Sequence, residues 1–304
     1  MKSVLITGAS GFVGGALCRA LVADGWRVLA LCRTAGSAAR LAQGVEAVIG
    51  DPTSPGPWQE RVAGCQAAVN LAGASIFGRW SASYKELIRS SRLASTGNLV
   101  QAVAGRPSGA PFRLVSASAV GYYGFGGDEE LDEASPPGDD FLARVCQEWE
   151  AQAMAAEQSG AMVAITRFGV VLGSGGGALG QMLPLFRLGL GGRLGHGRQW
   201  LSWIHQADLA AALKFVLERP ELRGAFNCCA PHPVTNRQFA KSLGRALGRP
   251  AVLPAPAFAV RLALGQFGSV LLEGQRALPQ RLRGAGFRFA QPTLDQALAD
   301  LLPR

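Results

Sequence analysis

Residues 7–14 read TGASGFVG and separate two runs that are typical of regular structure. The preceding SVLIT is apolar, as in a buried strand, and the following GGALCRALVADG has helical spacing. In such a strand–turn–helix, Gly8 forms the tight turn, Gly11 lets the backbone approach a pyrophosphate, and Gly14 lets the helix lie close to the strand. The GxxGxxG spacing therefore predicts a dinucleotide site, with an anion-free structural turn as the alternative.

The rest of the chain repeats the alternation of strand and helix. VLALCR, VEAVIGD, QAAVNLAG and FRLVSAS are nearly continuous apolar runs, and helical patterns follow several of them, including 37–43, 81–104 and 141–158. Such strands are typical of a parallel sheet covered on both faces. We expect a doubly wound α/β (Rossmann) fold.

Beyond residue 173 the sequence becomes rich in glycine, as in GSGGGALG and LGLGGRLGHGR, which we interpret as pliable segments. Short strands and helices follow. This change predicts an NAD(P)-binding domain over residues 1–172 and a smaller, interleaved C-terminal substrate domain over residues 173–304.

The end of the second predicted strand indicates which dinucleotide is bound. An NAD site usually has Asp or Glu there to hold the adenosine ribose. Here Cys32 occupies that place and Arg33 follows it. A guanidinium binds a 2′-phosphate through two hydrogen bonds, so NADP(H) is favoured over NAD(H). The alternative is a solvated charge at the strand end.

Charge and composition exclude several classes of function. The 30 basic and 21 acidic residues give a net charge of +9, but the basic residues are scattered and no nucleic-acid motif accompanies them. The six cysteines have no CxxC spacing, and the three histidines have no metal-ligand spacing. No signal peptide or membrane-length apolar stretch is present. We expect a cytoplasmic protein with buried thiols, no metal, and no nucleic-acid or membrane partner.

With these motifs in place, the chain resembles the extended short-chain dehydrogenase/reductase superfamily almost from end to end. TGASGFVG resembles its cofactor turn, VIGD its adenine-side aspartate, and NLAG and RFGVVLG its later motifs. The resemblance implies a set of cofactor-binding residues. These are Thr7, Gly8, Ser10, Gly11, Phe12, Val13, Gly14, Asp51, Leu71, Ala72, Gly73 and Arg167, together with Arg33.

A narrower resemblance is to the epimerase-family, or sugar-nucleotide-epimerase-like, subfamily. It rests on SASAVGYYG, GDDFLARVCQEWE, GGALGQMLPLFRLGLGG, GRQWLSWIH and LLEGQRALPQRL. Some members are linked to plastid or bacterial division, and others are called epimerases. By analogy with related folds, a homodimer would form through the helices near 81–104 and 141–158.

One part of the superfamily pattern is missing. Its members use a Tyr four residues before a Lys, and the Lys lowers the phenol pKa from its usual value near 10. No YxxxK occurs here: the tyrosines are 84, 122 and 123. Phe141 stands at the expected Tyr position, and Val145, or Cys146 if the register slips, at the expected Lys position.

Ser118 matches the superfamily serine, and Tyr122 lies four residues later, so these two are the candidate catalytic residues. The alternatives are a hydroxyl that satisfies the strand end for Ser118 and packing of the loop for Tyr122 and Tyr123. Arg144 could tune the phenol. Asp139 is expected to cap the helix that follows.

Other polar residues are weaker candidates. His205 is expected to order the turn before the Asp208 helix, and Lys85 to lie on a solvated helix face, with an anionic substrate as the alternative. Trp80 and Arg89 lie on the same segment. Arg198, Gln199 and Trp200 could line a substrate pocket.

Two functions remain open. The first is an NADP(H)-dependent oxidoreductase or epimerase that acts on a small carbonyl, hydroxyl or nucleotide-sugar substrate with a remodelled proton-transfer site. The second is a catalytically silent, NADP(H)-binding regulator, for example in cell division. The fold does not distinguish between them.

Overall fold

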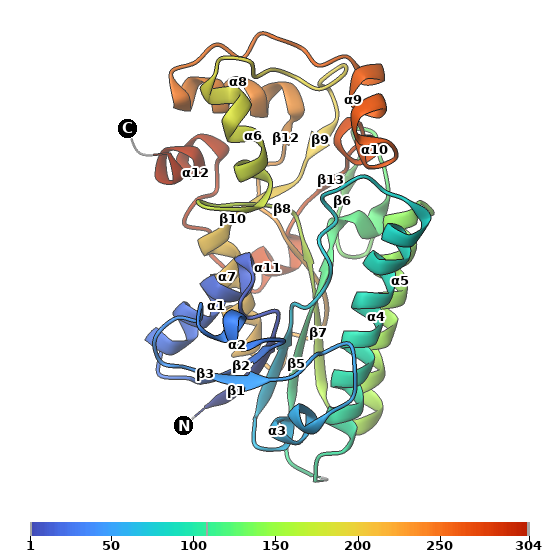
Figure 1. The fold of residues 1–304 in the computed structure, drawn as a ribbon, viewed down its shortest axis with the longest axis vertical. Helices are drawn as coiled ribbons and strands as arrows, with labels where there is room; N and C mark the ends of the chain where they lie inside the picture. The colour runs from blue at the N-terminus through green and yellow to red at the C-terminus, as the bar shows by residue number, and fades with distance from the viewer. Residues whose placement is uncertain (1, 108, 303–304) are drawn as a thin grey trace.

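The computed structural model describes residues 2–107 and 109–302 and is built on a central sheet of seven parallel strands (Figure 1). The strand order is β11-β7-β5-β4-β1-β2-β3. The strands are β1 (Ser3–Thr7), β2 (Arg27–Cys32), β3 (Val45–Ile49), β4 (Ala67–Asn70), β5 (Arg113–Ala119), β7 (Met162–Phe168) and β11 (Gly224–Cys228). Because β1 lies between β2 and β4, the order reverses at its carboxyl end, where open α/β sheets bind ligands.

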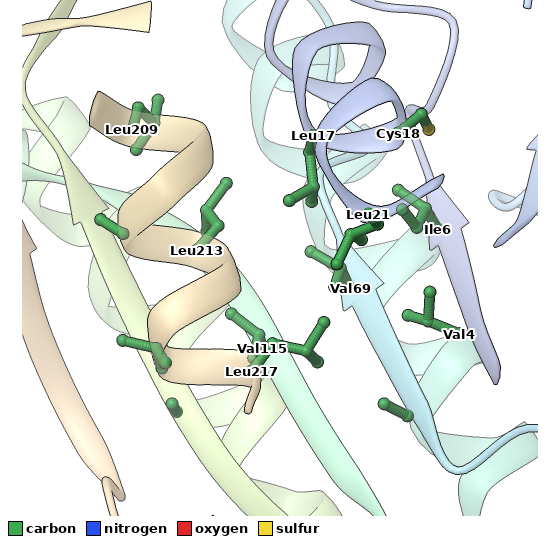
Figure 2. Close-up of a cluster of buried hydrophobic side chains, with 14 of the residues drawn as sticks. Val4, Ile6, Leu17, Cys18, Leu21, Val69, Val115, Leu209, Leu213 and Leu217 are labelled. Carbon is green, nitrogen blue, oxygen red and sulfur yellow. The ribbon is translucent and has the colours of Figure 1, made fainter. Parts of the chain in front are cut away.

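Helices cover both faces of this sheet, as the continuous apolar runs require. On one face, α1 (Phe12–Ala23) and α7 (Gln206–Leu217) pack on the alternate residues Val4, Ile6 and Val69 (Figure 2). On the other face, α4 (Ala82–Ala104) and α5 (Phe141–Met154) cover the intervening residues. The doubly wound Rossmann fold is therefore confirmed.

Short helices complete this part of the chain. The helix expected over 37–43 is wrong in extent, because the structure has only the four-residue α2 between Thr34, which caps it, and Ala39. The short elements are α2 (Ala35–Ala38), η1 (Pro57–Gln59), α3 (Glu60–Ala63), η2 (Val120–Tyr123) and η3 (Ala155–Ser159).

A second lobe lies beyond the carboxyl ends of β5 and β7, above the sheet in Figure 1. Its own apolar core includes Leu172, Trp203, Phe239 and Leu298. Its strands form two-stranded sheets and are β6 (Glu130–Leu131), β8 (Val170–Leu172), β9 (Trp200–Leu201), β10 (Trp203–His205), β12 (Val234–Thr235) and β13 (Arg276–Ala277). Its helices are α6 (Gly177–Arg187), α8 (Asn236–Leu247), α9 (Ala257–Leu264), α10 (Phe267–Leu272) and α12 (Leu294–Leu301).

The two parts are interleaved along the chain. After the first elements of the lobe, α7 returns to pack on α1, and β11 pairs with β7 at the edge of the large sheet. Then α11 (Gln280–Gly284) packs near β11. The large sheet is thus completed by residues that follow the first elements of the lobe in the sequence.

Two expectations from the sequence concern the helices and the cysteines. No helix in the described part of the chain is long and apolar enough to cross a membrane. All six cysteines are buried and unpaired, as expected from their apolar neighbours.

Candidate functional site

The glycines of the first turn contact backbone that a side chain would displace. Gly8 has φ +68°, and a Cβ atom there would lie 2.7 Å from the carbonyl oxygen of Leu71. A Cβ at Gly14 would overlap the carbonyl oxygen of Gly8, so α1 packs directly on the turn. Gly11 is the N-cap of α1 and makes no side-chain cap. The first N–H groups of α1 are therefore available to an anion, as a pyrophosphate cradle requires.

A cavity of about 380 Å³ borders this turn. Ser10, Gly11 and Phe12 form part of its wall, and the exposed Arg19 and Arg40 form another part. Neither arginine was predicted from the sequence as a site residue. A signal existed for Arg19, which lies four residues after Gly15 and therefore on the helix face that carries the turn. The cavity combines a helix N-terminus with two cations, which suits a phosphorylated ligand.

Phe12 joins the turn to the second lobe. A Cβ at Gly173, Gly176 or Gly177 would lie only 2.6 to 2.8 Å from its ring. In addition, Gln206 Nε2 donates to the Phe12 carbonyl oxygen at 2.7 Å. This part of the segment that sequence analysis interprets as pliable thus needs its glycines for close packing.

Thr7 lies beneath the turn and is fully buried. Its hydroxyl donates to Asn70 Oδ1 at 2.7 Å and accepts from the N–H groups of Leu71 and Ala72 at 3.1 and 3.2 Å. These bonds join the ends of β1 and β4. Thr7 therefore positions the backbone of 71–73, where only Gly73 is exposed.

Arg33 and Asp51 lie near each other after β2 and β3, and both are exposed. Hydrogen bonds from the backbone and side chain of Thr53 lower the pKa of Asp51, and the charge of Arg33 adds to this effect. The structure thus brings together the two residues that sequence analysis assigns to the adenosine end. Val13, in contrast, packs partly against the core beneath α1.

Ser118 is part of a buried charged network. Its hydroxyl donates to Glu150 Oε1 at 2.6 Å, and the serine is only 2% exposed. The same carboxylate pairs with Arg167 through two hydrogen bonds of 2.8 Å. Burial alone would lower the pKa of Arg167, but Glu150 and Tyr123 outweigh it and raise the pKa. Glu150 was not predicted from the sequence, and neither was a carboxylate partner for Arg167, a predicted cofactor residue.

The two neighbouring tyrosines differ in their surroundings. Tyr123 is buried, its hydroxyl donates to Asn227 Oδ1 at 2.8 Å, and Arg167 Nη1 donates to that hydroxyl at 3.0 Å. Burial raises the pKa of Tyr123 to about 12, against the opposing effect of Arg167. Tyr122 is half-buried, and its ring lies 3.4 Å from the Arg167 guanidinium carbon. Among the described residues, no side chain or backbone group hydrogen-bonds to the Tyr122 hydroxyl.

The structure also shows what replaces the missing lysine. Burial raises the pKa of the Cys146 thiol to about 11, the charge of Glu150 adds to the rise, and hydrogen bonds with Ser118 and the Ala119 backbone oppose it. Of the two residues predicted at the lysine position, Cys146 is the one beside Ser118, near Glu150 of the same helix, which favours the slipped register. In that register Leu142 takes the tyrosine position one turn earlier, and neither residue can serve as the usual acid.

The remaining predictions on single residues are partly corrected. The cap expected at Asp139 is wrong by one residue: Asp140 is the N-cap of α5, and its Oδ1 accepts from Ala143 N at 3.0 Å. Its φ of −73° and ψ of 177° give it the extended backbone that a cap needs. His205 caps α7 through Ala207 N at 3.1 Å, as expected. In the part of the chain that the structure describes, no group of His, Cys, Asp and Glu is arranged to hold a metal.

Comparison with protein families agrees with this geometry. Residues 4–229 match the family described as NAD dependent epimerase/dehydratase. Residues 255–301 match a domain of unknown function, DUF1731.

Similar proteins come from distant organisms. The chain is 41% identical to epimerase family protein SDR39U1 homolog, chloroplastic, of Arabidopsis thaliana, over 99% of this chain and 86% of that protein. It is 36% identical to epimerase family protein YfhF of Bacillus subtilis, over 99% of this chain and 98% of that protein. The names of these relatives give no substrate.

Solved structures extend the comparison. Human epimerase family protein SDR39U1, crystallised with NADPH, has 36% identity and a TM-score of 0.85 over 99% of both chains. A nucleoside-diphosphate sugar epimerase of Corynebacterium glutamicum has 35% identity and a TM-score of 0.78, over 99% of this chain and 58% of that one. Thermus thermophilus UDP-glucose 4-epimerase with NAD has 21% identity and a TM-score of 0.78, and so shares the fold.

Proposed function

Because the chain belongs to the NAD dependent epimerase/dehydratase family, we propose that it binds NADP(H) and reduces a small carbonyl compound, with Tyr122 as the proton donor. The observation that carries the proposal is the Tyr122 ring stacked at 3.4 Å on the guanidinium of Arg167. This pair lies at the end of β5, where the superfamily places its reacting groups.

The cofactor would lie along the turn of Gly8, Gly11 and Gly14. The helix N-terminus would hold its pyrophosphate, and Arg33 its 2′-phosphate, with Arg19 and Arg40 as further cations. The NADPH in the crystal of the human relative, which is 36% identical, supports this choice of dinucleotide. When bound, NADPH supplies a hydride, that is two electrons, to the carbonyl carbon.

The chain supplies the proton. As the carbonyl oxygen gains negative charge, the Tyr122 hydroxyl transfers its proton to that oxygen, which gives an alcohol. Arg167 lies against the face of the phenol ring and holds it in position. Water then restores the proton to Tyr122.

The test has two steps. Nicotinamide fluorescence of purified protein titrated with NADPH and with NADH should show tighter binding of NADPH. NADPH should then be consumed when aldehydes and ketones from a panel are added, which is measured as a fall in absorbance at 340 nm. Absence of binding to either dinucleotide would overturn the proposal.

A catalytically silent NADP(H)-binding regulator is the second candidate, and one observation favours it. The Ser118 hydroxyl is buried and donates to Glu150 at 2.6 Å, so it is not free to hold a substrate oxygen. Tight NADPH binding without consumption by any member of the panel, and with a partner protein retained only in the bound state, would support this function instead.

A further inference from the structure

A second cavity, of about 300 Å³, lies at the start of α5. Phe141 and Leu142 of α5 line it, together with Lys85 of α4 and residues of α10. Leu142 lies one helical turn before Cys146, the residue that contacts Ser118. Leu142 also borders the loop that carries Tyr122, because a Cβ at the preceding Gly121 would lie 3.6 Å from the Leu142 side chain. The cavity volume is at the lower end of the range for ligand pockets.

Aromatic rings form one side of this cavity. The Trp80 ring lies 5.3 Å from Phe141 and 5.8 Å from Phe267, with the Phe141 contact edge to face. Phe125 also lines the cavity and is 44% exposed, and Phe77, which packs on Phe267 at 5.9 Å, is 40% exposed. Exposed rings around a cavity favour a flat apolar ligand, because stacking removes their faces from water.

Lys85 provides a single cation in this wall. Its ammonium lies 5.0 Å from the centre of the Phe141 ring and donates to Gln266 Oε1 at 3.2 Å. No carboxylate of the described residues lies within 4.0 Å of this ammonium. Asp140 also lines the cavity, but its Oδ1 accepts from the backbone as the cap of α5. Lys85 is only partly buried, so its ammonium is accessible to a ligand.

We propose that the substrate is a small aromatic aldehyde or ketone that carries a carboxylate. Its ring would stack against Trp80 and Phe141, and its carboxylate would pair with Lys85. Reduction adds a hydride to the carbonyl carbon and a proton to its oxygen, and the product is the aryl alcohol. This inference rests on the proposed function.

The chemistry of the cavity disfavours a nucleotide sugar. A pyrophosphate carries at least two negative charges and is usually bound by several cations or helix N–H groups. Among the residues of this cavity only Lys85 carries a positive charge, and Asp140 carries a negative one, so the wall lacks the several cations that a pyrophosphate needs.

The experiment compares 4-carboxybenzaldehyde with its neutral methyl ester, methyl 4-formylbenzoate. Binding is measured by calorimetry on the full chain with NADP+ present, so that no reduction takes place. We expect the acid to bind about fivefold more tightly than the ester, as one partly exposed ion pair allows. Lys85→Gln should abolish this difference. Lys241→Gln, an exposed lysine on α8, should retain it. Trp80→Leu should weaken both ligands.

The outcomes separate this inference from the proposed function. Binding that depends on Lys85 without consumption of NADPH would retain the cavity as a site for an aromatic carboxylate, and it would overturn the reductase and the role of this ligand as its substrate. Equal binding of acid and ester, or binding insensitive to Lys85→Gln, would overturn the inference. NADPH consumption with neutral aldehydes, without binding that depends on Lys85, would overturn it and retain a reductase of other specificity.

Discussion

The guanidinium carbon of Arg167 lies 3.4 Å from the centre of the Tyr122 ring, while the edge of the same guanidinium is paired with Glu150. One arginine thus faces the phenol and is held in place by a buried carboxylate. The edge of the guanidinium binds Glu150, which fixes the orientation of Arg167. Its flat face contacts the Tyr122 ring.

Tyr122→Phe removes only the hydroxyl that the proposed reaction needs. We expect turnover with a reducible carbonyl to fall about 10²- to 10⁴-fold, which is the usual contribution of a general acid. NADPH affinity should remain unchanged, because the ring and its stacking persist. Steady-state kinetics and a nicotinamide fluorescence titration measure the two quantities. Unchanged turnover would exclude Tyr122 as the proton donor.

Glu150→Gln leaves Arg167 buried without its charge partner. Loss of one member of a buried pair typically costs about 3 kcal/mol or more, so we expect a large drop in the free energy of unfolding. Glu148→Gln is the matched control on the same helix, because Glu148 forms an exposed pair with Arg89. That control should change the free energy by about 1 kcal/mol or less. Urea unfolding of both variants measures the difference, and equal effects would contradict it.

Gly14→Ala places a Cβ against the Gly8 carbonyl oxygen. Because the contact is with backbone, the turn must shift, and we expect a loss of about 1 to 3 kcal/mol in stability together with much weaker NADPH binding. The control is Gly180→Ala within α6, where a Cβ would meet nothing within 4 Å. Thermal unfolding and NADPH titration should separate the two variants. Normal NADPH binding by Gly14→Ala would show that the turn is not the cradle.

Arg33→Asp tests the choice of dinucleotide. A charged hydrogen bond to a 2′-phosphate is worth about 1.5 to 3 kcal/mol, so NADPH affinity should fall about 10- to 100-fold while NADH affinity stays level or rises. Arg245→Asp, which replaces an exposed arginine of α8, controls for the change in net charge. If NADPH affinity is retained in Arg33→Asp, the 2′-phosphate belongs to Arg19 and Arg40 instead.

The buried Tyr123 predicts a dependence of stability on alkaline pH. Its pKa is about 12 in the folded chain, against 10.0 in its ordinary state, because burial disfavours the phenolate. A pKa raised on folding gives stability that is complete below pH 10 and is lost as the pH rises toward 12. Tyr123→Phe should therefore lose less stability over this range than the parent chain. Tyr84→Phe, a change at a half-buried tyrosine, should follow the parent.

Much of the fold was predictable because its signals are local. Apolar runs and helical spacing identify strands and helices, and Gly8, Gly11 and Gly14 act within one turn of chain. Arg33 was assigned to the adenosine end from its place after the second strand, and Asp51 from the resemblance of VIGD to the family motif. These inferences need no knowledge of distant contacts.

The buried pair and the second cavity depend on distant contacts and were not predictable. Nothing in its local sequence distinguishes Glu150 from other helical residues, because its partner Arg167 is reached only through the packing of α5 on β7. The contact of Lys85 with Gln266 was not predictable, because Gln266 lies 181 residues further along the chain. The one-residue error at Asp139 has a simpler cause, since two adjacent aspartates offer the same capping chemistry and only the backbone decides between them.

The return of α7 and β11 to the large sheet has a consequence for synthesis on the ribosome. The glycine turn and α1 emerge first, and α1 can pack on the strands of the sheet, but its contact with α7, residues Gln206–Leu217, forms only when α7 has left the exit tunnel. A nascent chain that ends before this point leaves that side of α1 open to water and to chaperones. A fragment cut at residue 172 would keep the whole nucleotide turn and still lack the helix that packs on α1.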